Sequence, residues 1–558
     1  MTRRQREAER SLHDQHNLLP KKQVIIALFS LAIPLLIAFI DQNGIGVTLP
    51  TIARDLHAEG TISWAGTTSL IANAAFQMLY GRLSDIFGRK VVYLAAIGCL
   101  AIAALLCGFA QNSIMFYVFR GIAGIGGGGL NNLSMIIVSD VVTLEERGYY
   151  QGIIGSFIGL GNVIGPFLAA AFIARASWRA FFWTTAPLAA ALGVVSFYTL
   201  PSTPLTQGLK ENVRKIDYGG VLLSTTSIIF LLVPISGGGA YFPWTSPMVV
   251  SMLVLGAVCL SLFIVWEWKI AKLPMIPSKR YIPFRKPSLD VAVLLGQNFL
   301  LGCAYQSLLY YLPLYLQNAR QYSVMQSAAV VAVPVGVQSL SSVLSGRFIS
   351  WVGHWKGVVC TGICLWTFGS GLVLLYKRNT SMGVIVAPLV IMGLGIGCSF
   401  QPTVTGLQSH TTKSRRAVII SSRNFFRCAG GSAGLAISAA VLQAVLKKSL
   451  PTDLQRLANS AYALPKFEGH DAEAVLDAYM DASRAVFIFQ ASLVGLCLLG
   501  CAFVKDHGLR PLEEQIETMG QEDSENGHQG LTEKAVVTAN SLSREATAAA
   551  GEVGTHRN

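Results

Sequence analysis

The sequence predicts an all-α polytopic membrane protein. Of its 558 residues, 52% are hydrophobic and only 13% are charged, and the mean hydropathy is +0.50. Soluble domains carry about 25% charged residues, so this composition argues against an ordinary soluble fold. The apolar residues also gather in runs of about 20, which is the length that a helix needs to cross a bilayer.

Fourteen apolar windows of this kind can be placed along the chain. Their approximate ranges are 24–51, 62–80, 91–110, 114–139, 151–174, 180–200, 217–236, 247–268, 289–315, 325–345, 357–376, 383–404, 417–446 and 484–504. We therefore expect fourteen transmembrane helices.

The net charge of +13 reflects topology and does not indicate nucleic acid. Most Lys and Arg residues fall in the connections that face the cytoplasm if the N-terminus is inside, as the positive-inside rule requires. In this orientation Asn379 of the sequon Asn379-Thr380-Ser381 lies outside, where it could be glycosylated. The 10 cysteines all lie within apolar runs, without the spacing of a zinc site or a disulfide framework, so no metal is expected.

Two short polar stretches at equivalent places indicate an internal repeat. Residues 81–90, GRLSDIFGRK, follow the second window, and residues 345–356, SGRFISWVGHWK, follow the second window after an inserted pair. The aligned pairs are Gly81 and Gly346, Arg82 and Arg347, and Gly88 and Gly353. Parallel repeats of six helices build many secondary transporters.

The stretch Gly81-Arg82-Leu83-Ser84-Asp85-Ile86-Phe87-Gly88-Arg89-Lys90 resembles the cytoplasmic loop signature of the major facilitator superfamily. The resemblance implies two six-helix bundles plus two inserted spans. The segments would then be a cytoplasmic tail (1–23), a bundle (24–200), a linker with the extra spans (201–288), a second bundle (289–505) and a disordered cytoplasmic tail (506–558).

The same resemblance implies a gating loop at the cytoplasmic side. Its residues would be Gly81, Arg82, Asp85, Gly88, Arg89 and Lys90. The glycines permit a tight turn, and Asp85 can pair with basic groups or stabilise a helix end. The alternative is a solvated loop that only follows the positive-inside rule.

Two further stretches resemble the fourteen-span drug:proton antiporters that are common in fungi. Residues 120–128, RGIAGIGGG, are similar to the intramembrane arginine motif, with Ala123 in place of the usual glutamine. Gly161, Gly165 and Pro166 resemble the antiporter motif of the fifth span. Residues 124–129 also fit GxGxxG, but within a membrane helix they cannot form a nucleotide-binding βαβ unit.

Ionisable residues at membrane depth are costly and mark function by default. Asp41 lies within the first span and Arg120 within the fourth. We expect Asp41 to take up and release a proton, with Arg120 as its partner in proton coupling. The alternative is a fixed ion pair without a role in transport.

Other polar residues within the spans are candidates for lining a cavity. They are Asn73, Gln77, Gln297, Gln306, Gln401 and Arg427. Amides at such positions could equally form hydrogen bonds between helices. Arg423 and Arg427 share a helix face near the inner end of a span, so their side chains could instead reach toward the membrane surface.

The resemblance implies a monomeric pump that uses the proton gradient and no cofactor. It would export amphipathic small molecules such as drugs, toxins or secondary metabolites by alternating access through a lipid bilayer. The plasma membrane is the expected location, with the vacuolar membrane as the alternative. A carrier of basic amino acids or siderophores is the alternative function. An enzyme is not expected, because the spans hold no His, Asp and Glu constellation, and the tail does not suggest a sensor domain.

Overall fold

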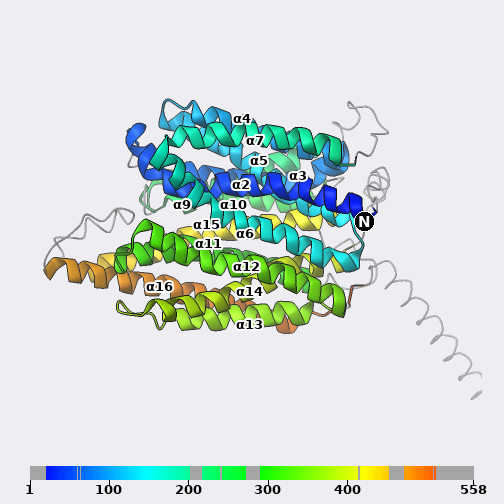
Figure 1. Cartoon of the computed structure of the whole chain (residues 1–558). Helices are drawn as coiled ribbons and strands as arrows, with labels where there is room; N and C mark the ends of the chain where they lie inside the picture. The colour runs from blue at the N-terminus through cyan, green and yellow to red at the C-terminus, as the bar shows by residue number, and fades with distance from the viewer. Residues whose placement is uncertain are drawn as a thin grey trace, which may run out of the picture. The chain divides into compact units, whose positions relative to one another are not determined.

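The computed structural model consists of long α-helices joined by short connections (Figure 1). It describes residues 20–58, 61–62, 64–201, 216–238, 242–271, 289–411, 415–450, 470–506 and 508–509, without the side chains of residues 47, 50, 324 and 470–472. Most of the two predicted tails and parts of the predicted linker lie outside these residues.

The first group of helices corresponds to the predicted N-terminal bundle. Its members are α2 (Lys21–Asp55), α3 (Trp64–Phe87), α4 (Arg89–Gly108), α5 (Ser113–Val141), α6 (Leu144–Arg175) and α7 (Trp178–Thr199). Helix α2 packs on α6 and α7, while α5 packs on α3 and α4.

The second group comprises the helices after residue 289. Its members are α11 (Leu289–Leu314) with a π-helical turn (Tyr315–Ala319), α12 (Val324–Val352), α13 (Lys356–Val373), α14 (Met382–Ser409), α15 (Arg416–Ser449) and α16 (His470–Gly500) with a final 3₁₀ turn (Cys501–Phe503). Helix α11 packs on α15 and α16, and α14 packs on α12 and α13.

The inserted pair consists of α9 (Tyr218–Gly237) and α10 (Pro247–Lys269), which form an antiparallel hairpin between the two groups. Two six-helix bundles and one inserted hairpin confirm the predicted fold class. Among the described residues, 13 helices are long and apolar enough to cross a membrane. The remaining long helix, α3, carries buried polar residues such as Asn73 and Gln77, which lower its hydropathy.

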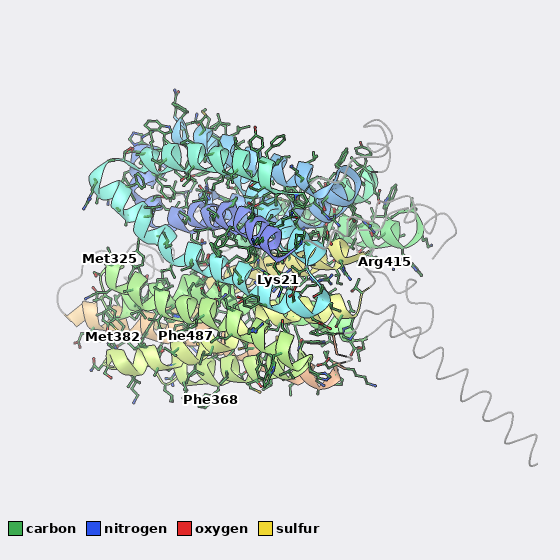
Figure 2. All side chains as sticks on the ribbon, turned by 45° about the vertical axis from the view of Figure 1, so that its right-hand side comes forward. Lys21, Met325, Phe368, Met382, Arg415 and Phe487 are labelled. Atoms are coloured by element: carbon green, nitrogen blue, oxygen red, sulfur yellow. The ribbon has the colours of Figure 1, made fainter. Side chains whose placement is uncertain are left out.

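Apolar side chains cover the outer surfaces of the helices. Leu222, Leu255 and Phe368 are at least half exposed, as lipid-facing residues would be. Figure 2 places Phe368 on the outside of the second bundle, with Met325 and Met382 at one end of the helices and Arg415 toward the other. These labels agree with the alternating direction of the spans.

Several helices extend beyond their predicted windows, and α2 and α16 are two examples. Helix α2 continues to Asp55, beyond the predicted end at 51, and α16 begins at His470, well before the predicted start at 484. An apolar window detects only the part of a helix that lies in lipid, so polar extensions such as the Glu473–Asp481 segment escape it.

The bundles meet most closely where α6 packs on α12. A Cβ atom on Gly148 would lie 3.0 Å from the carbonyl oxygen of Gly346, and one on Gly155 would lie 2.6 Å from Ser342 Oγ. Small residues at these positions let two helix backbones approach, as in other membrane interfaces. This seam therefore closes by direct helix contact.

Candidate functional site

A cavity lies between the two bundles. Its lining residues are Phe39, Gln42, Asn43, Leu70, Asn73, Asn131, Met135, Gly155, Ile158 and Asn162 of the first bundle, and Gly302, Tyr305, Gln306, Leu309, Gln338, Ser342, Gly397, Phe400, Gln401, Arg423, Arg427, Cys428, Gly431 and Ser432 of the second. Its volume, measured over positions open to the centre of a water molecule, is about 70 Å³. This is room for several water molecules.

Two arginines of α15 give the cavity its charge. Among the described residues that line it, Arg423 and Arg427 are the charged side chains, and none is an Asp or Glu. Both guanidinium groups lie 5.8 Å from the centre of the Phe400 ring. The cavity therefore presents an uncompensated positive charge.

The two arginines are held differently. Arg423 donates to the carbonyl oxygen of Phe400 at 2.6 Å and to Asn424 Oδ1 at 2.9 Å, and its side chain is buried. In the described part of the chain, Arg427 has no hydrogen bond or ion pair, and its buried Nε lacks a partner. Arg423 thus belongs to the scaffold, whereas Arg427 has its donors free for a solute.

Amide and hydroxyl groups surround this charge. Asn162 accepts from Asn43 at 2.7 Å and donates to Tyr305 at 3.2 Å, which links α2, α6 and α11 across the cavity. The Oε1 atoms of Gln338 and Gln401 are buried without a hydrogen-bond partner in the described structure. These groups could exchange hydrogen bonds with a polar solute or with water.

Four of the predicted cavity residues line this site, and two do not. Asn73, Gln306, Gln401 and Arg427 are in its wall. Gln77 instead donates to Asn73 Oδ1 at 2.7 Å, and Gln297 donates to the carbonyl oxygen of Cys497 at 2.8 Å between α11 and α16. Gln297 thus joins two helices, which was the alternative that the sequence left open, whereas the bond from Gln77 to Asn73 stays within α3.

Asp41 and Arg120 form an ion pair inside the first bundle. Arg120 Nη1 lies 2.6 Å from Asp41 Oδ2, and both side chains are almost fully buried. Asp41 Oδ1 and two guanidinium nitrogens of Arg120 have no hydrogen-bond partner among the described residues. Asp41 directly precedes Gln42 and Asn43, which line the cavity.

The predicted antiporter motif brings α6 against α2 beside this ion pair. A Cβ atom on Gly161 would lie 2.6 Å from Phe39 Cβ, and one on Gly165 would lie 2.9 Å from the carbonyl oxygen of Ile40. Pro166 lies within α6, where it removes one backbone hydrogen bond. The motif therefore fixes α2 at the residues flanking Asp41.

The predicted gating loop forms a charged network where α3 meets α4. Asp85 pairs with Arg89 at 2.6 Å and lies 3.6 Å from Arg82, while Arg89 also reaches Asp140 at 2.9 Å. Gly88 separates α3 from α4 with φ +89°, a conformation that favours glycine. The ammonium group of Lys90 lies 5.1 Å from the centre of the Phe197 ring.

Next to the cavity, buried amides of α5 and α15 join the two bundles. Asn424 donates to Asn132 Oδ1 at 3.0 Å, and Asn132 donates to Ser421 Oγ at 2.7 Å. One turn nearer the start of α15, a Cβ atom on Gly81 would lie 3.0 Å from the carbonyl oxygen of Ala417. At this end of the helices the two bundles therefore meet through α3 and α5 of the first and α15 of the second.

The second copy of the loop obtains its carboxylate from elsewhere in the chain. Gly353 has φ +78°, matching Gly88, but Ser350 stands where the first copy has Asp85. Asp506, which follows α16, accepts from the backbone amides of Trp355 at 3.1 Å and Lys356 at 3.0 Å. It thereby caps α13 and ties it to the end of the last span.

Sequence reasoning missed several of these residues. Asn132 was not among the predicted site residues, although an amide within an apolar span is itself a signal of helix pairing. Asp140 and Asp506 lie at span ends, where charge is common, so no sequence signal separates them from other residues. Asn379 is exposed in the turn before α14, and its glycosylation stays a prediction. No group of three or more metal-ligating side chains occurs within the described ranges.

Comparison with known families decides the class of protein. The profile described as Major Facilitator Superfamily matches residues 31–435, which span both bundles. The chain belongs to the major facilitator superfamily. It is a transporter and not an enzyme, and this confirms the resemblance that the loop signature carried.

Several relatives are fungal transporters of the same superfamily. "Citrate exporter 1" of Yarrowia lipolytica is 43% identical over 562 aligned residues, which cover 98% of this chain and 83% of the relative. "MFS-type transporter clz4" of Cochliobolus lunatus is 42% identical over 90% of each chain. "Efflux pump dotC" of Dothistroma septosporum is 30% identical over 79% of this chain and 75% of the pump.

A solved structure supports the fold alone. The proton:xylose symporter XylE matches with a TM-score of 0.59 and 15% identity, covering 89% of this chain and 99% of the symporter. The superfamily makes this a multi-pass membrane transporter of a small molecule, with the lipid bilayer as its surroundings.

Proposed function

We propose that this transporter exports small organic anions that carry more than one carboxylate, and that protons moving inward drive the export. The single observation that carries the proposal is the charge of the cavity, where Arg427 has free donors and no described carboxylate compensates it. Guanidinium groups bind carboxylates through paired, charge-assisted hydrogen bonds.

The relative named "Citrate exporter 1" supports this choice of cargo, because its similarity extends over 98% of the chain. The same charge argues against basic amino acids, the alternative considered above, because Arg423 and Arg427 would repel a cationic side chain. The amphipathic cargo expected from the sequence then narrows to molecules that also bear carboxylates. The aromatic groups Tyr305 and Phe400 can accept the apolar part of such a molecule.

The proposed transport cycle opens the cavity first to the cytoplasm and then to the other side of the membrane. In a state open to the cytoplasm, the anion would bind at Arg427 after the contacts of α15 with Gly81 and Asn132 have separated. Closing these contacts, as in the present structure, would leave the anion free to depart on the other side. Such alternation requires that the cargo binds the two states with different free energy.

Proton coupling is assigned to Asp41. A proton on Asp41 would remove its charge and leave Arg120 without its partner, which is a large change for a pair buried in the first bundle. Because α2 also carries Gln42 and Asn43 into the cavity wall, the protonation state of Asp41 would alter the cavity. An inside-negative membrane potential by itself favours anion exit, by roughly 2.3 kcal/mol per charge per 100 mV, so coupling needs its own test.

We propose the plasma membrane as the location of this transporter, and the test is efflux from a host that lacks its own exporters. Cells are loaded with a labelled tricarboxylate, a dicarboxylate, a cationic amphiphile or lysine, and each efflux is compared with that of Arg427→Gln. We expect carboxylates to leave cells with the unaltered chain faster than cells with Arg427→Gln. Faster efflux of the cationic amphiphile or lysine, with carboxylate efflux unchanged, would contradict the proposal. Retention of the chain in the vacuolar membrane would overturn the assigned location.

A further inference from the structure

The hairpin of α9 and α10 lies at one particular seam between the bundles. Helix α9 contacts α3 of the first bundle and α15 of the second, and α10 packs on α9 (Figure 1). The other seam, between α6 and α12, closes by direct contact of small residues. The two seams are therefore built differently, although the two bundles are related by a repeat.

The contact of α9 with this seam is apolar around Ile228 and Leu232. Ile228 and Leu232 are buried against Ile71 and Ala75 of α3, in a cluster that Phe425 of α15 also joins. Toward the cytoplasmic end, Phe263 of α10 packs on Met78 of α3. The hairpin thus covers the seam at several levels of the membrane.

The residues just behind this contact belong to the cavity wall. Leu70 and Asn73 of α3 and Cys428 of α15 line the cavity, and Cys428 Sγ lies 3.7 Å from Asn73 Oδ1. Cys428 also packs against the apolar cluster that contains α9. At this seam α9 is therefore next to the thin wall that separates the cavity from the membrane.

The opposite face of the hairpin has the character of a lipid-exposed surface. Leu255, Val258 and Leu262 of α10 are each about half exposed, and Leu222 of α9 is 68% exposed. An apolar face toward lipid and a second apolar face toward the seam suit a helix pair that fills a gap in a membrane.

We propose that the α9–α10 hairpin seals the cavity from lipid at the α3–α15 seam, so that cargo enters and leaves only through water. The inference rests on the proposed function only in taking this cavity as the transport site. It implies cargo that is soluble in water, such as a polycarboxylate. It excludes entry of a hydrophobic molecule through this side from the lipid.

The test uses the thiol of Cys428 in full-length protein whose other nine cysteines are replaced by alanine or serine. A charged thiosulfonate probes the cavity from water, and an uncharged alkyl maleimide dissolved in the bilayer probes from lipid. We expect Cys428 to react with the charged reagent and to react far more slowly with the lipid-dissolved one than does a lipid-facing reference, Leu222→Cys. Equal rates at Cys428 and at the reference would overturn the proposal.

A second measurement removes the seal. Ile228→Ala with Leu232→Ala opens the contact with α3, and Leu222→Ala on the lipid side of the same helix is the matched control. We expect several-fold faster labelling of Cys428 from lipid in the double variant and no change in the control. Unchanged labelling in a folded double variant contradicts the seal. If that variant does not fold, the comparison of Cys428 with Leu222→Cys in the otherwise unaltered hairpin tests the proposal instead. Lipid-side labelling with normal carboxylate export overturns only the seal, whereas a sealed Cys428 without carboxylate export overturns only the proposed function.

Discussion

Replacing Arg427 by glutamine removes the free positive charge of the cavity and keeps a side chain of similar length. The structure predicts little loss of stability, because among the described residues Arg427 makes a ring contact, at 5.8 Å from the centre of Phe400, and no hydrogen bond or ion pair. Such a contact contributes about 0.5–1 kcal/mol. The variant should therefore reach the membrane and unfold at nearly the normal temperature.

The loss of anion binding should be much larger. A hydrogen bond to a charged group contributes about 1.5–3 kcal/mol. Since about 1.4 kcal/mol corresponds to a tenfold change in affinity, Arg427→Gln should raise the Kd for a tricarboxylate roughly 10- to 150-fold. Arg427→Lys keeps the positive charge but lacks the planar guanidinium group. Its Kd for the tricarboxylate should lie between those of the unaltered protein and Arg427→Gln.

Binding of a labelled tricarboxylate to purified protein in detergent measures this effect directly. The matched control is Arg378→Gln, which removes an arginine that pairs with Asp477 at 2.9 Å outside the cavity. We expect the control to bind normally. A Kd for Arg427→Gln within twofold of the unaltered protein would refute the assignment of this cavity as an anion site.

Three further predictions concern coupling and closure. Asp41→Asn should abolish the stimulation of anion efflux by an imposed pH gradient in vesicles, because the charge facing Arg120 is lost; full stimulation would contradict the coupling role. Gly81→Val should hold the cytoplasmic side open, since even a Cβ atom there would collide with Ser421 Oγ; we expect faster labelling of α15 from the cytoplasmic side, and an unchanged rate would argue against this closure. Asp506→Ala should lower the free energy of unfolding by about 0.5–2 kcal/mol through the lost cap of α13, and an unchanged Tm would show that the cap contributes nothing.

Much of the fold could be predicted because the bilayer imposes a simple rule on the sequence. Each span must satisfy its backbone hydrogen bonds within a helix of about 20 apolar residues. The rule located the spans but not their polar extensions, as the early start of α16 at His470 shows. The rule also gives α3 a low hydropathy, because buried polar groups such as Gln77 face neighbouring helices there rather than lipid.

The site was predicted less completely, because the charge of the cavity depends on which side chains from different helices line it. Asp41 and Arg120 could be singled out because each is costly at membrane depth. The sequence does not show that these two charges pair away from the cavity, or that Arg427 lies within it without a carboxylate among the described lining residues. Likewise, Asp506 and the loop before α13 are about 150 residues apart, so only the fold brings them together.

The most direct measurement is counterflow in liposomes that contain the purified protein and a high internal concentration of an unlabelled tricarboxylate. External labelled tricarboxylate should accumulate transiently inside, and Arg427→Gln should accumulate far less under the same conditions. A cationic amphiphile or lysine in place of the label should not accumulate. Accumulation of the cation together with no accumulation of the tricarboxylate would contradict the proposal that this transporter carries organic anions.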